Sequence, residues 1–301
     1  MRESKTRGQF LWRSALRAIQ RNRPHVLLPD IDLKAVVNLF TLWESLLDLI
    51  FPPAQECPLC GGVSSDGVIC GSCEVLLRGY RHEGACEVCG RLPDKAGKHS
   101  AGGGFLCGEC SRSKRAFDRA LATGPYEGVL REAVHRLKYK GERHLAAPLA
   151  GLMVERMTEF GTLSQGLDYL IPVPLSTNKL HQRGFNQAQL LAKEISSKTA
   201  IPLRDNIIVK TVDTPSQTGL PKAVREVNLY GAFKVIDPQS LSHRKVMVVD
   251  DVFTTGSTVS AVARAVKQAG AQRAYVITAT TARISSSRFE VRKSVPASAN
   301  I

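Results

Sequence analysis

The segment from Val246 to Thr258 constrains the fold of this chain more than any other part of the sequence. It begins with apolar, mostly β-branched residues that predict a buried strand. Two adjacent carboxylates, Asp250 and Asp251, follow at the end of this strand, and a short loop of hydroxyl residues with one glycine comes next. Apolar residues at helical spacing then predict a helix from Ser257 to Gln268. The fold must therefore bring a strand end, an acid pair and a helix start to one place.

The loop between this strand and this helix predicts a binding site for a phosphate group. Backbone N–H groups at a helix N-terminus favour an anion, and a glycine permits the left-handed or crowded backbone that such a loop needs. The candidate binding residues are Thr254, Thr255, Gly256, Ser257 and Thr258. The acid pair beside them is suited to sugar hydroxyls or to Mg²⁺. An ordinary strand end with helix-capping threonines uses similar residues, but the complete order of the segment favours the phosphate site.

This segment resembles, position for position, the motif with which type I phosphoribosyltransferases bind 5-phosphoribosyl-1-pyrophosphate (PRPP). The resemblance implies that Asp250 and Asp251 hold the ribose hydroxyls and the Mg²⁺ ion of bound PRPP. It also implies that the residues from Thr254 to Thr258 hold the 5-phosphate group.

The cysteines predict a metal-binding module ahead of this motif. All eight fall into Cys-x-x-Cys pairs, namely Cys57 and Cys60, Cys70 and Cys73, Cys86 and Cys89, and Cys107 and Cys110. Two such pairs supply the thiolates of one tetrahedral Zn²⁺ site, so we expect two structural zinc ions. The first and third pairs share one local pattern, and the second and fourth share another, which suggests two successive zinc ribbons. A crossed pairing of the knuckles stays open, because sequence alone does not fix pairing.

Charge and hydropathy narrow the class of partner and the compartment. The formal net charge of +14 favours anionic partners, which include phosphates, nucleic acid and anionic lipid. Arginines interrupt every apolar stretch of the basic N-terminus, so no secretory signal is expected. Residues 31–53 carry an apolar stripe at helical spacing together with Lys34, Glu44 and Asp48, which favours an amphipathic helix over a transmembrane span. We therefore expect a cytoplasmic protein, in which thiols stay reduced.

From Phe117 onward, strand-like and helix-like segments alternate, which predicts an α/β domain with a mainly parallel sheet. Ligands of such sheets bind beyond the carboxyl ends of the strands. The expected strands are Ala120–Tyr126, Asp168–Pro174, Asn206–Lys210, Lys245–Asp250 and Ala274–Thr280.

Two further stretches lie between the expected strands. The stretch from Ile171 to Gln187 runs from a strand into a polar loop, and its Lys179 and Arg183 are candidate cations for the pyrophosphate group; a solvated loop would have a similar composition. The polar stretch from Thr214 to Asn228 is either a lid over the substrate or an ordinary surface loop.

Several motifs in a fixed order resemble one family, the ComF/GntX-type phosphoribosyltransferase-like proteins. They are Leu47–Pro53, the paired cysteines, Leu137-Lys138-Tyr139, the Pro172-Val173-Pro174 and Arg183–Gln187 blocks, Gln217 with Arg225 and Asn228, and the acid-pair motif. The match runs from about residue 46 to residue 282. The resemblance implies a PRPP-type fold behind a double zinc ribbon and, in some bacteria, a link to DNA uptake in natural competence.

Two functions are consistent with these features. The first is Mg²⁺-assisted displacement of pyrophosphate from PRPP, with Asp250, Asp251, Lys179 and Arg183 as candidate catalytic residues and an unknown acceptor. The alternative is a non-catalytic adaptor or single-stranded-DNA-binding protein that retains the PRPP pocket. In that case DNA or DNA-uptake proteins are the partners, and the basic residues between Arg131 and Arg143, with Tyr139 for base stacking, are the expected contact surface.

The expected organisation has five parts. A basic extension covers residues 1–30, an amphipathic helix 31–53, a double zinc ribbon 54–113, a phosphoribosyltransferase-like domain 114–283, and a polar tail without regular structure 284–301.

Overall fold

The computed structural model describes residues 55–64, 68–94, 105–161, 166–211, 231–284 and 292–293. The expected basic extension, the expected amphipathic helix and the candidate lid therefore lie outside the described residues. Within the described part of the chain, no helix is both long enough and apolar enough to cross a membrane.

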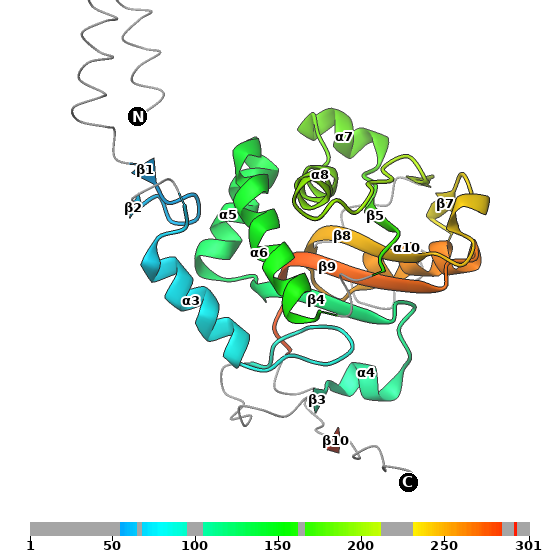
Figure 1. The fold of residues 1–301 in the computed structure, drawn as a ribbon, viewed down its shortest axis with the longest axis horizontal. Helices are drawn as coiled ribbons and strands as arrows, with labels where there is room; N and C mark the ends of the chain where they lie inside the picture. The colour runs from blue at the N-terminus through cyan, green and yellow to red at the C-terminus, as the bar shows by residue number, and fades with distance from the viewer. Residues whose placement is uncertain are drawn as a thin grey trace, which may run out of the picture. The chain divides into compact units, whose positions relative to one another are not determined.

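A parallel sheet of four strands forms the centre of the protein (Figure 1). Its order is β5-β8-β9-β4, and each neighbouring pair is parallel. The strands are β4 (Arg119–Pro125), β5 (Tyr169–Pro172), β8 (Lys245–Phe253) and β9 (Arg273–Thr281). Both faces are covered, which is why the central strands read as nearly continuous apolar runs. This arrangement confirms the predicted α/β fold with a mainly parallel sheet.

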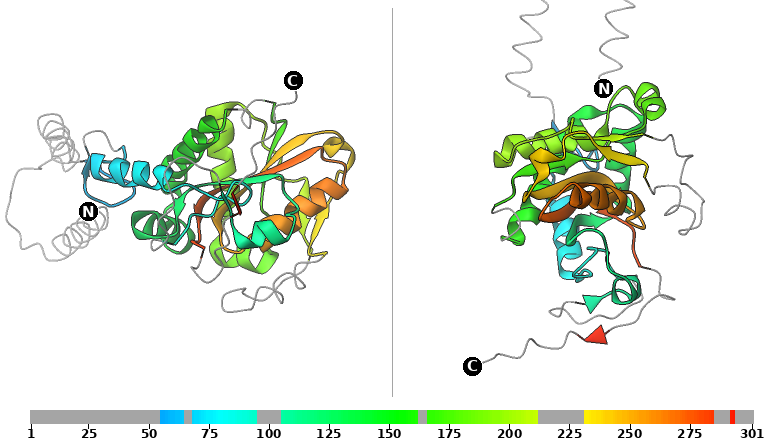
Figure 2. Two further views of the ribbon diagram at one scale, coloured as in Figure 1. Left: turned by 90° about the horizontal axis from the view of Figure 1, so that it is seen from below. Right: turned by 90° about the vertical axis from the view of Figure 1, so that its right-hand side faces the viewer.

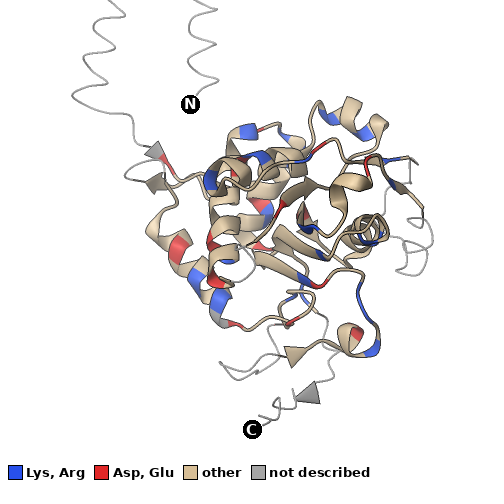
Figure 3. Ribbon diagram, turned by 45° about the vertical axis from the view of Figure 1, so that its right-hand side comes forward, with Lys and Arg blue, Asp and Glu red and all other residues tan. Residues whose placement is uncertain are grey.

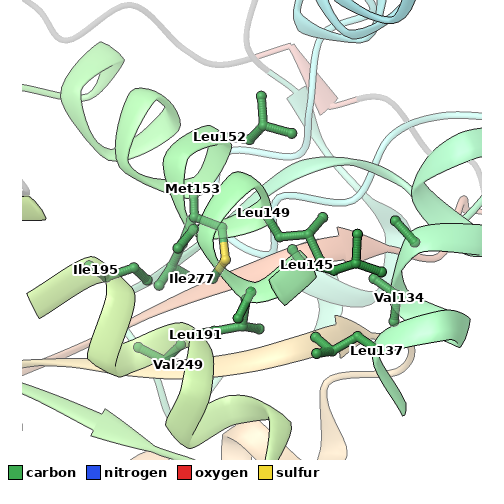
Figure 4. Packing of buried hydrophobic residues seen from close by; sticks show 14 of the residues in the cluster. Val134, Leu137, Leu145, Leu149, Leu152, Met153, Leu191, Ile195, Val249 and Ile277 are labelled. Carbon is green, nitrogen blue, oxygen red and sulfur yellow. The ribbon is translucent and has the colours of Figure 1, made fainter. Parts of the chain in front are cut away.

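Helices cover both faces of the sheet (Figure 2). One face carries α5 (Gly128–Tyr139), α6 (Ala146–Glu159) and α8 (Gln187–Thr199), and the opposite face carries α10 (Ser257–Gln268). Each face of the sheet has its own hydrophobic core, because successive side chains along a strand point to opposite faces. Met247 and Val249 pack with the first group of helices, as Figure 4 shows for Val249, and Val246 and Val248 pack with α10.

The structure differs from the expected elements in two places. The strand β6 (Ile208–Lys210) is not part of the parallel sheet, because it pairs antiparallel with β7 (Phe233–Val235) in a separate ribbon. The expected polar loop after β5 contains a short helix, α7 (Thr177–Arg183), which ends at Gly184 in the left-handed conformation. Short 3-10 turns at Arg143–Leu145 and Gln239–Leu241 complete the domain.

The cysteine-rich module consists of two small units, each with a short strand and a helix. The first contains β1 (Gln55–Glu56), β2 (Val63–Ser64) and α3 (Gly71–His82). The second contains β3 (Phe105–Leu106) and α4 (Gly108–Arg112). A two-residue strand, β10 (Arg292–Lys293), pairs antiparallel with β3. It falls in the segment 284–301 for which we expected no regular structure.

The α6 face of the sheet provides a direct test of this packing. Leu149 of α6 is 1% exposed within the core shown in Figure 4. Leu149→Ala should therefore lower the free energy of unfolding by about 2–5 kcal/mol, because it removes buried methyl groups and leaves a cavity. Denaturant unfolding at fixed zinc concentration measures this loss. The control Val75→Ala, at a position that is 70% exposed, should change it by less than about 0.5 kcal/mol. Equal losses in the two variants would contradict the assigned core.

Candidate functional site

The acid pair lies within the last part of β8, which continues three residues further than the expected strand Lys245–Asp250. On one side, β5 stops at Pro172, opposite Val249. On the other side, β9 continues to pair with β8 as far as Phe253. Asp250 and Asp251 are therefore flanked by β9 on one side, while β5 does not extend beside them on the other. This places the pair at the carboxyl edge of the sheet, where ligands of such folds bind.

A lysine from α5 neutralises Asp251. The Nζ atom of Lys138 lies 2.7 Å from Oδ2 of Asp251, and the two side chains are 16% and 9% exposed. Burial alone would lower the pKa of Lys138, but the charge of Asp251 and its hydrogen bond raise that pKa above its usual value. Lys138 is therefore a charged member of the site; the sequence analysis placed it in a family motif and in a basic stripe but not among the candidate site residues.

Asp250 is in a different electrostatic situation from its neighbour. Burial and the adjacent charge of Asp251 raise the pKa of Asp250 to about 8, against the opposing effect of Lys138. Its Oδ1 atom accepts a hydrogen bond from the backbone N–H of Asp251, at 2.9 Å. Asp250 is therefore mostly protonated near neutral pH, even though Lys138 lies nearby. A hard divalent cation such as Mg²⁺ would bind to the oxygens of both residues and would favour the ionised form of Asp250.

The loop after the acid pair has the backbone conformation that the sequence predicts. Gly256 has a φ of +77°, and a Cβ atom at this position would lie 2.3 Å from Cζ of Phe253. Phe253 is 1% exposed and packs edge-on against Phe117, so it has little room to move. Glycine is thus required here for two independent reasons, the dihedral angle and the contact with the ring.

The hydroxyl groups of this loop are partly arranged. The hydroxyl oxygens of Thr255 and Ser257 lie 2.8 Å apart, and Ser257 begins α10 with its side chain buried. Thr254 is exposed and Thr258 is half-buried. We refer to Thr254–Thr258 as the phosphate loop. Arg115, which the sequence analysis did not select, donates a hydrogen bond from Nη1 to the carbonyl oxygen of Thr255, at 3.3 Å.

The segment after β5 lies next to the end of α5. The guanidinium of Arg183 lies over the ring of Tyr139, 5.3 Å from its centre, and donates to Oε1 of Gln187 at 3.1 Å. Asn186 caps α8 by accepting from the backbone N–H of Ala188. Consecutive residues of α5 thus reach two candidate groups, because Lys138 contacts Asp251 and Tyr139 contacts Arg183. The other predicted cation, Lys179, is half-buried on α7.

The side chain of Ser176 adds a polar group to this edge. It is 2% exposed in the turn that precedes α7, and its Oγ atom has no hydrogen-bond partner within the described protein. Nε2 of the buried Gln187 also has no hydrogen-bond partner within the described protein. Buried polar atoms without partners are uncommon in folded proteins. Both residues follow β5, so these unpartnered atoms lie in the segment that carries the candidate pyrophosphate-binding cations Lys179 and Arg183.

The expected basic stripe on α5 is not a continuous surface. Arg136 donates three hydrogen bonds to the carboxylate of Glu142 and one to the carbonyl oxygen of Pro58, and Lys138 faces Asp251. Exposed positions on the stripe are Arg131, Lys140 and Arg143. Figure 3 shows that lysines and arginines of the described residues are spread over several elements. Two residues of the predicted DNA footprint, Arg136 and Lys138, thus pair with carboxylates of the protein itself, and contact of this stretch with DNA stays a prediction.

The cysteines form two separate clusters, in the order that the repeat suggests. Cys57, Cys60, Cys70 and Cys73 make the first, and Cys86, Cys89, Cys107 and Cys110 make the second, with all sulfur atoms of a cluster within 4.8 Å of one another. The crossed pairing is therefore excluded. Sulfur atoms around tetrahedral zinc lie about 3.8 Å apart, given Zn–S bonds of about 2.3 Å. Neighbouring sulfurs here lie 3.6 to 3.9 Å apart, so each cluster fits one zinc ion without an open coordination position.

Three comparisons place the chain among known proteins. A phosphoribosyl transferase domain matches residues 182–299, and a double zinc ribbon domain matches residues 46–111. The solved B. subtilis glutamine PRPP amidotransferase, with ADP and GMP, has a TM-score of 0.32 and 16% identity over 48% of this chain and 30% of that one. A purine phosphoribosyltransferase from Pyrococcus horikoshii has a TM-score of 0.28 and 17% identity over 44% of this chain and 80% of that one. These two values are too low to carry an argument.

Fold, cysteine clusters and domain matches together define a phosphoribosyltransferase-like protein with a double zinc ribbon. The DNA utilization protein YhgH of Salmonella typhimurium is 31% identical over 67% of this chain and 92% of its own length. Competence protein F of Haemophilus influenzae is 28% identical over 69% of this chain and 88% of its own. Competence protein ComFC of Bacillus subtilis is 23% identical over 68% and 80%. The chain belongs to the ComF family of phosphoribosyltransferase-like proteins.

The two clusters differ in exposure, and zinc release should show this difference. Cys60 of the first cluster is exposed, whereas the second cluster has three buried cysteines and one of intermediate exposure. We expect two zinc ions per chain after purification under reducing conditions, and faster release from the first site to a colorimetric chelator. Cys60→Ser should remove the fast-released ion and keep the other. One zinc ion per wild-type chain, or a single rate for both ions, would contradict this.

Substitution of Gly256 tests the geometry of the phosphate loop. Gly256→Ala should destabilise the fold by more than the roughly 1–3 kcal/mol of a strained dihedral angle, because the new Cβ atom meets Phe253. The matched control is Gly141→Ala, where φ is +69° but no atom lies within 4 Å. Denaturant unfolding of both variants separates the dihedral cost from the contact with the ring. Equal costs at the two positions would show that Phe253 does not restrict the loop.

Proposed function

We propose that this protein binds PRPP together with Mg²⁺ at the carboxyl edge of β8. The observation that supports this most directly is the joint placement of the acid pair and the left-handed Gly256 between a central parallel strand and a helix N-terminus. In this proposal, the phosphate loop holds the 5-phosphate through backbone N–H groups and the hydroxyls of Thr255 and Ser257. Asp250 and Asp251 hold the ribose hydroxyls and the metal ion.

The ionisation of the acid pair explains why a cation would be needed. Lys138 pairs with Asp251, while burial and the charge of Asp251 raise the pKa of Asp250 to about 8, so Asp250 is mostly protonated near neutral pH. A bound Mg²⁺ ion would displace this proton and would stabilise the negative charge on a departing pyrophosphate. Lys138 holds the carboxyl group of Asp251 in position through their 2.7 Å contact.

The reaction that this arrangement favours is displacement of pyrophosphate from the anomeric carbon of ribose. An acceptor forms a bond to this carbon as the bond to the pyrophosphate oxygen breaks. Arg183 and Lys179 follow β5 and supply fixed positive charge for the leaving group, and the unpartnered Ser176 Oγ and Gln187 Nε2 add hydrogen-bond capacity there. Release of pyrophosphate from PRPP in the presence of Mg²⁺ and a panel of nucleobases, with and without single-stranded DNA, is the assay for this activity.

Binding of PRPP should depend on the acid pair and on Mg²⁺. Calorimetric titration of the wild type with PRPP should show binding with Mg²⁺ and much weaker binding without it. Asp250→Asn combined with Asp251→Asn should remove the Mg²⁺-dependent part while the protein stays folded. The matched control is Asp118→Asn, which removes a carboxylate that pairs with Lys267 and Arg273 outside the proposed site. An affinity that is unchanged by the double substitution would refute the proposed site.

We also propose that the protein takes part in the handling of DNA. The names of its relatives refer to competence and to DNA utilization, and the net charge of +14 favours a polyanion. The observation in the structure that supports contact with DNA is Tyr139, an aromatic side chain that is 61% exposed at the end of α5, beside the exposed Lys140. An exposed aromatic ring with nearby cations suits stacking with an unpaired base.

Titration of labelled single-stranded DNA tests this second proposal. Binding should weaken steeply with salt if phosphate contacts dominate. Tyr139→Ala should lower the affinity about tenfold, and Tyr139→Phe should not, because the ring that stacks is retained. No binding of the wild type at low salt would refute the proposal. An equal loss in the Phe variant would exclude stacking as the role of Tyr139.

A further inference from the structure

A chain of buried polar contacts connects the second cysteine cluster with the phosphate loop. Oε2 of Glu109 lies 2.7 Å from Nη2 of Arg115 and 3.0 Å from Nη2 of Arg91. Arg115 in turn donates from Nη1 to the carbonyl oxygen of Thr255, at 3.3 Å. Arg91 also donates to Sγ of Cys107, at 3.6 Å. The guanidinium of Arg115 thus contacts both Glu109 of the second zinc ribbon and Thr255 of the phosphate loop.

The members of this chain are enclosed by protein. The side chains of Arg91, Glu109 and Arg115 are 7%, 9% and 6% exposed. Buried charges are tolerated only when they are paired, so none of the three can move without cost to the others. Nε of Arg91 and Nε of Arg115 have no hydrogen-bond partner within the described protein, so Glu109 is the contact that joins the two guanidinium groups. A displacement of Glu109 would therefore reach Arg115 directly.

Glu109 has a position that the zinc ion would fix. It lies in α4 between two cysteines of the second cluster, Cys107 and Cys110, and a metal ion held by both would set the orientation of this turn. A zinc ion with four thiolates carries a net charge of about −2, which favours two arginines nearby. Loss of the ion would release the turn and with it the carboxylate that anchors Arg115.

We propose that Arg115 is a positioning residue of the phosphate loop, through which zinc in the second ribbon and a phosphate group in the loop stabilise one another. With zinc bound, Glu109 holds Arg115 against the carbonyl oxygen of Thr255, and the loop keeps the conformation that receives the 5-phosphate. This inference rests on the proposed function, since it takes the loop as a phosphate site. Coupling between two sites is reciprocal in binding free energy, so a ligand in the loop must also tighten the binding of zinc. We expect this tighter binding to appear as slower release of zinc.

The first ribbon provides a contrast within the same molecule. Its contact with α5 runs from Arg136 to the carbonyl oxygen of Pro58, and Arg136 then pairs with Glu142. None of the contacts that connect the described residues of this ribbon to α5 reaches the phosphate loop. The coupling should therefore be specific to the second zinc ion.

The experiment measures zinc release to a colorimetric chelator with and without ribose 5-phosphate. This probe carries the 5-phosphate group but no pyrophosphate, so the test does not depend on turnover. Saturating ribose 5-phosphate should slow release of the second zinc ion at least about fivefold and leave the first unchanged. Cys60→Ser, which removes a ligand of the exposed first site, identifies the phase that belongs to the second.

Variants at Arg115 separate coupling from folding. Arg115→Met should keep two zinc ions, lose the effect of ribose 5-phosphate on zinc release, and bind ribose 5-phosphate more weakly. If the Met variant fails to fold, Arg115→Lys takes its place. This variant retains the charge, but one ammonium group cannot reach both Glu109 and Thr255. The effect of ribose 5-phosphate on zinc release should then be partly lost. The matched control is Arg283→Met, which removes another buried arginine whose partners are Glu83, Glu127 and Pro93. In this control, ribose 5-phosphate should still slow the release of the second zinc ion.

The possible outcomes are distinct. If ribose 5-phosphate binds to the wild type but does not slow zinc release, the coupling is refuted and the phosphate site stands. If ribose 5-phosphate does not bind at all, both the phosphate site and the coupling are refuted. If Arg283→Met abolishes the effect as fully as Arg115→Met, the effect comes from general docking of the ribbon and the role of Arg115 is refuted.

Discussion

The need to compensate two adjacent carboxylates inside a sheet shapes the whole site. Asp250 and Asp251 lie in β8, which pairs with β9 as far as Phe253, and uncompensated charge is costly inside a covered sheet. Lys138 meets this need for Asp251 only because α5 ends beside the carboxyl edge of β8. The same helix end presents Tyr139 to Arg183 and buries Leu137 in the core. One turn of helix therefore joins the sheet, the acid pair and the segment that follows β5.

The zinc ribbons contribute to this site in unequal ways. The two clusters have the same local design, since the backbone N–H of Cys70 donates to Cys57 and that of Cys107 donates to Cys86, both at 3.4 Å. Their surroundings differ, because the second cluster is the more buried and adjoins the network around Glu109. A repeated unit has thus acquired two environments, one open to solvent and one joined to the phosphate loop.

Local patterns predicted much of the fold, and contacts between distant segments explain the rest. The helix from Ser257 to Gln268 has the predicted bounds because its apolar spacing is a local property. The pairing within each ribbon followed from the repeat of the knuckles. In contrast, β6 was assigned to the wrong sheet, since its partner β7 is distant in sequence. The roles of Lys138 and Arg115 depend on where a helix end and a ribbon lie relative to β8, and no local pattern carries that information.

The order of strands in the sheet has a consequence for biosynthesis. The strand β4 is the first strand of the sheet in the sequence, and its partner β9 is the last. About half of the chain must therefore be synthesised after β4 before its partner strand exists. A nascent chain leaves the ribosome from its N-terminus, and its early parts fold as units. Both cysteine clusters emerge before β4, so the ribbons can take up metal while the transferase-like domain is still incomplete. If zinc is supplied during translation rather than after it, the transferase-like domain would then fold against ribbons that already hold their metal ions.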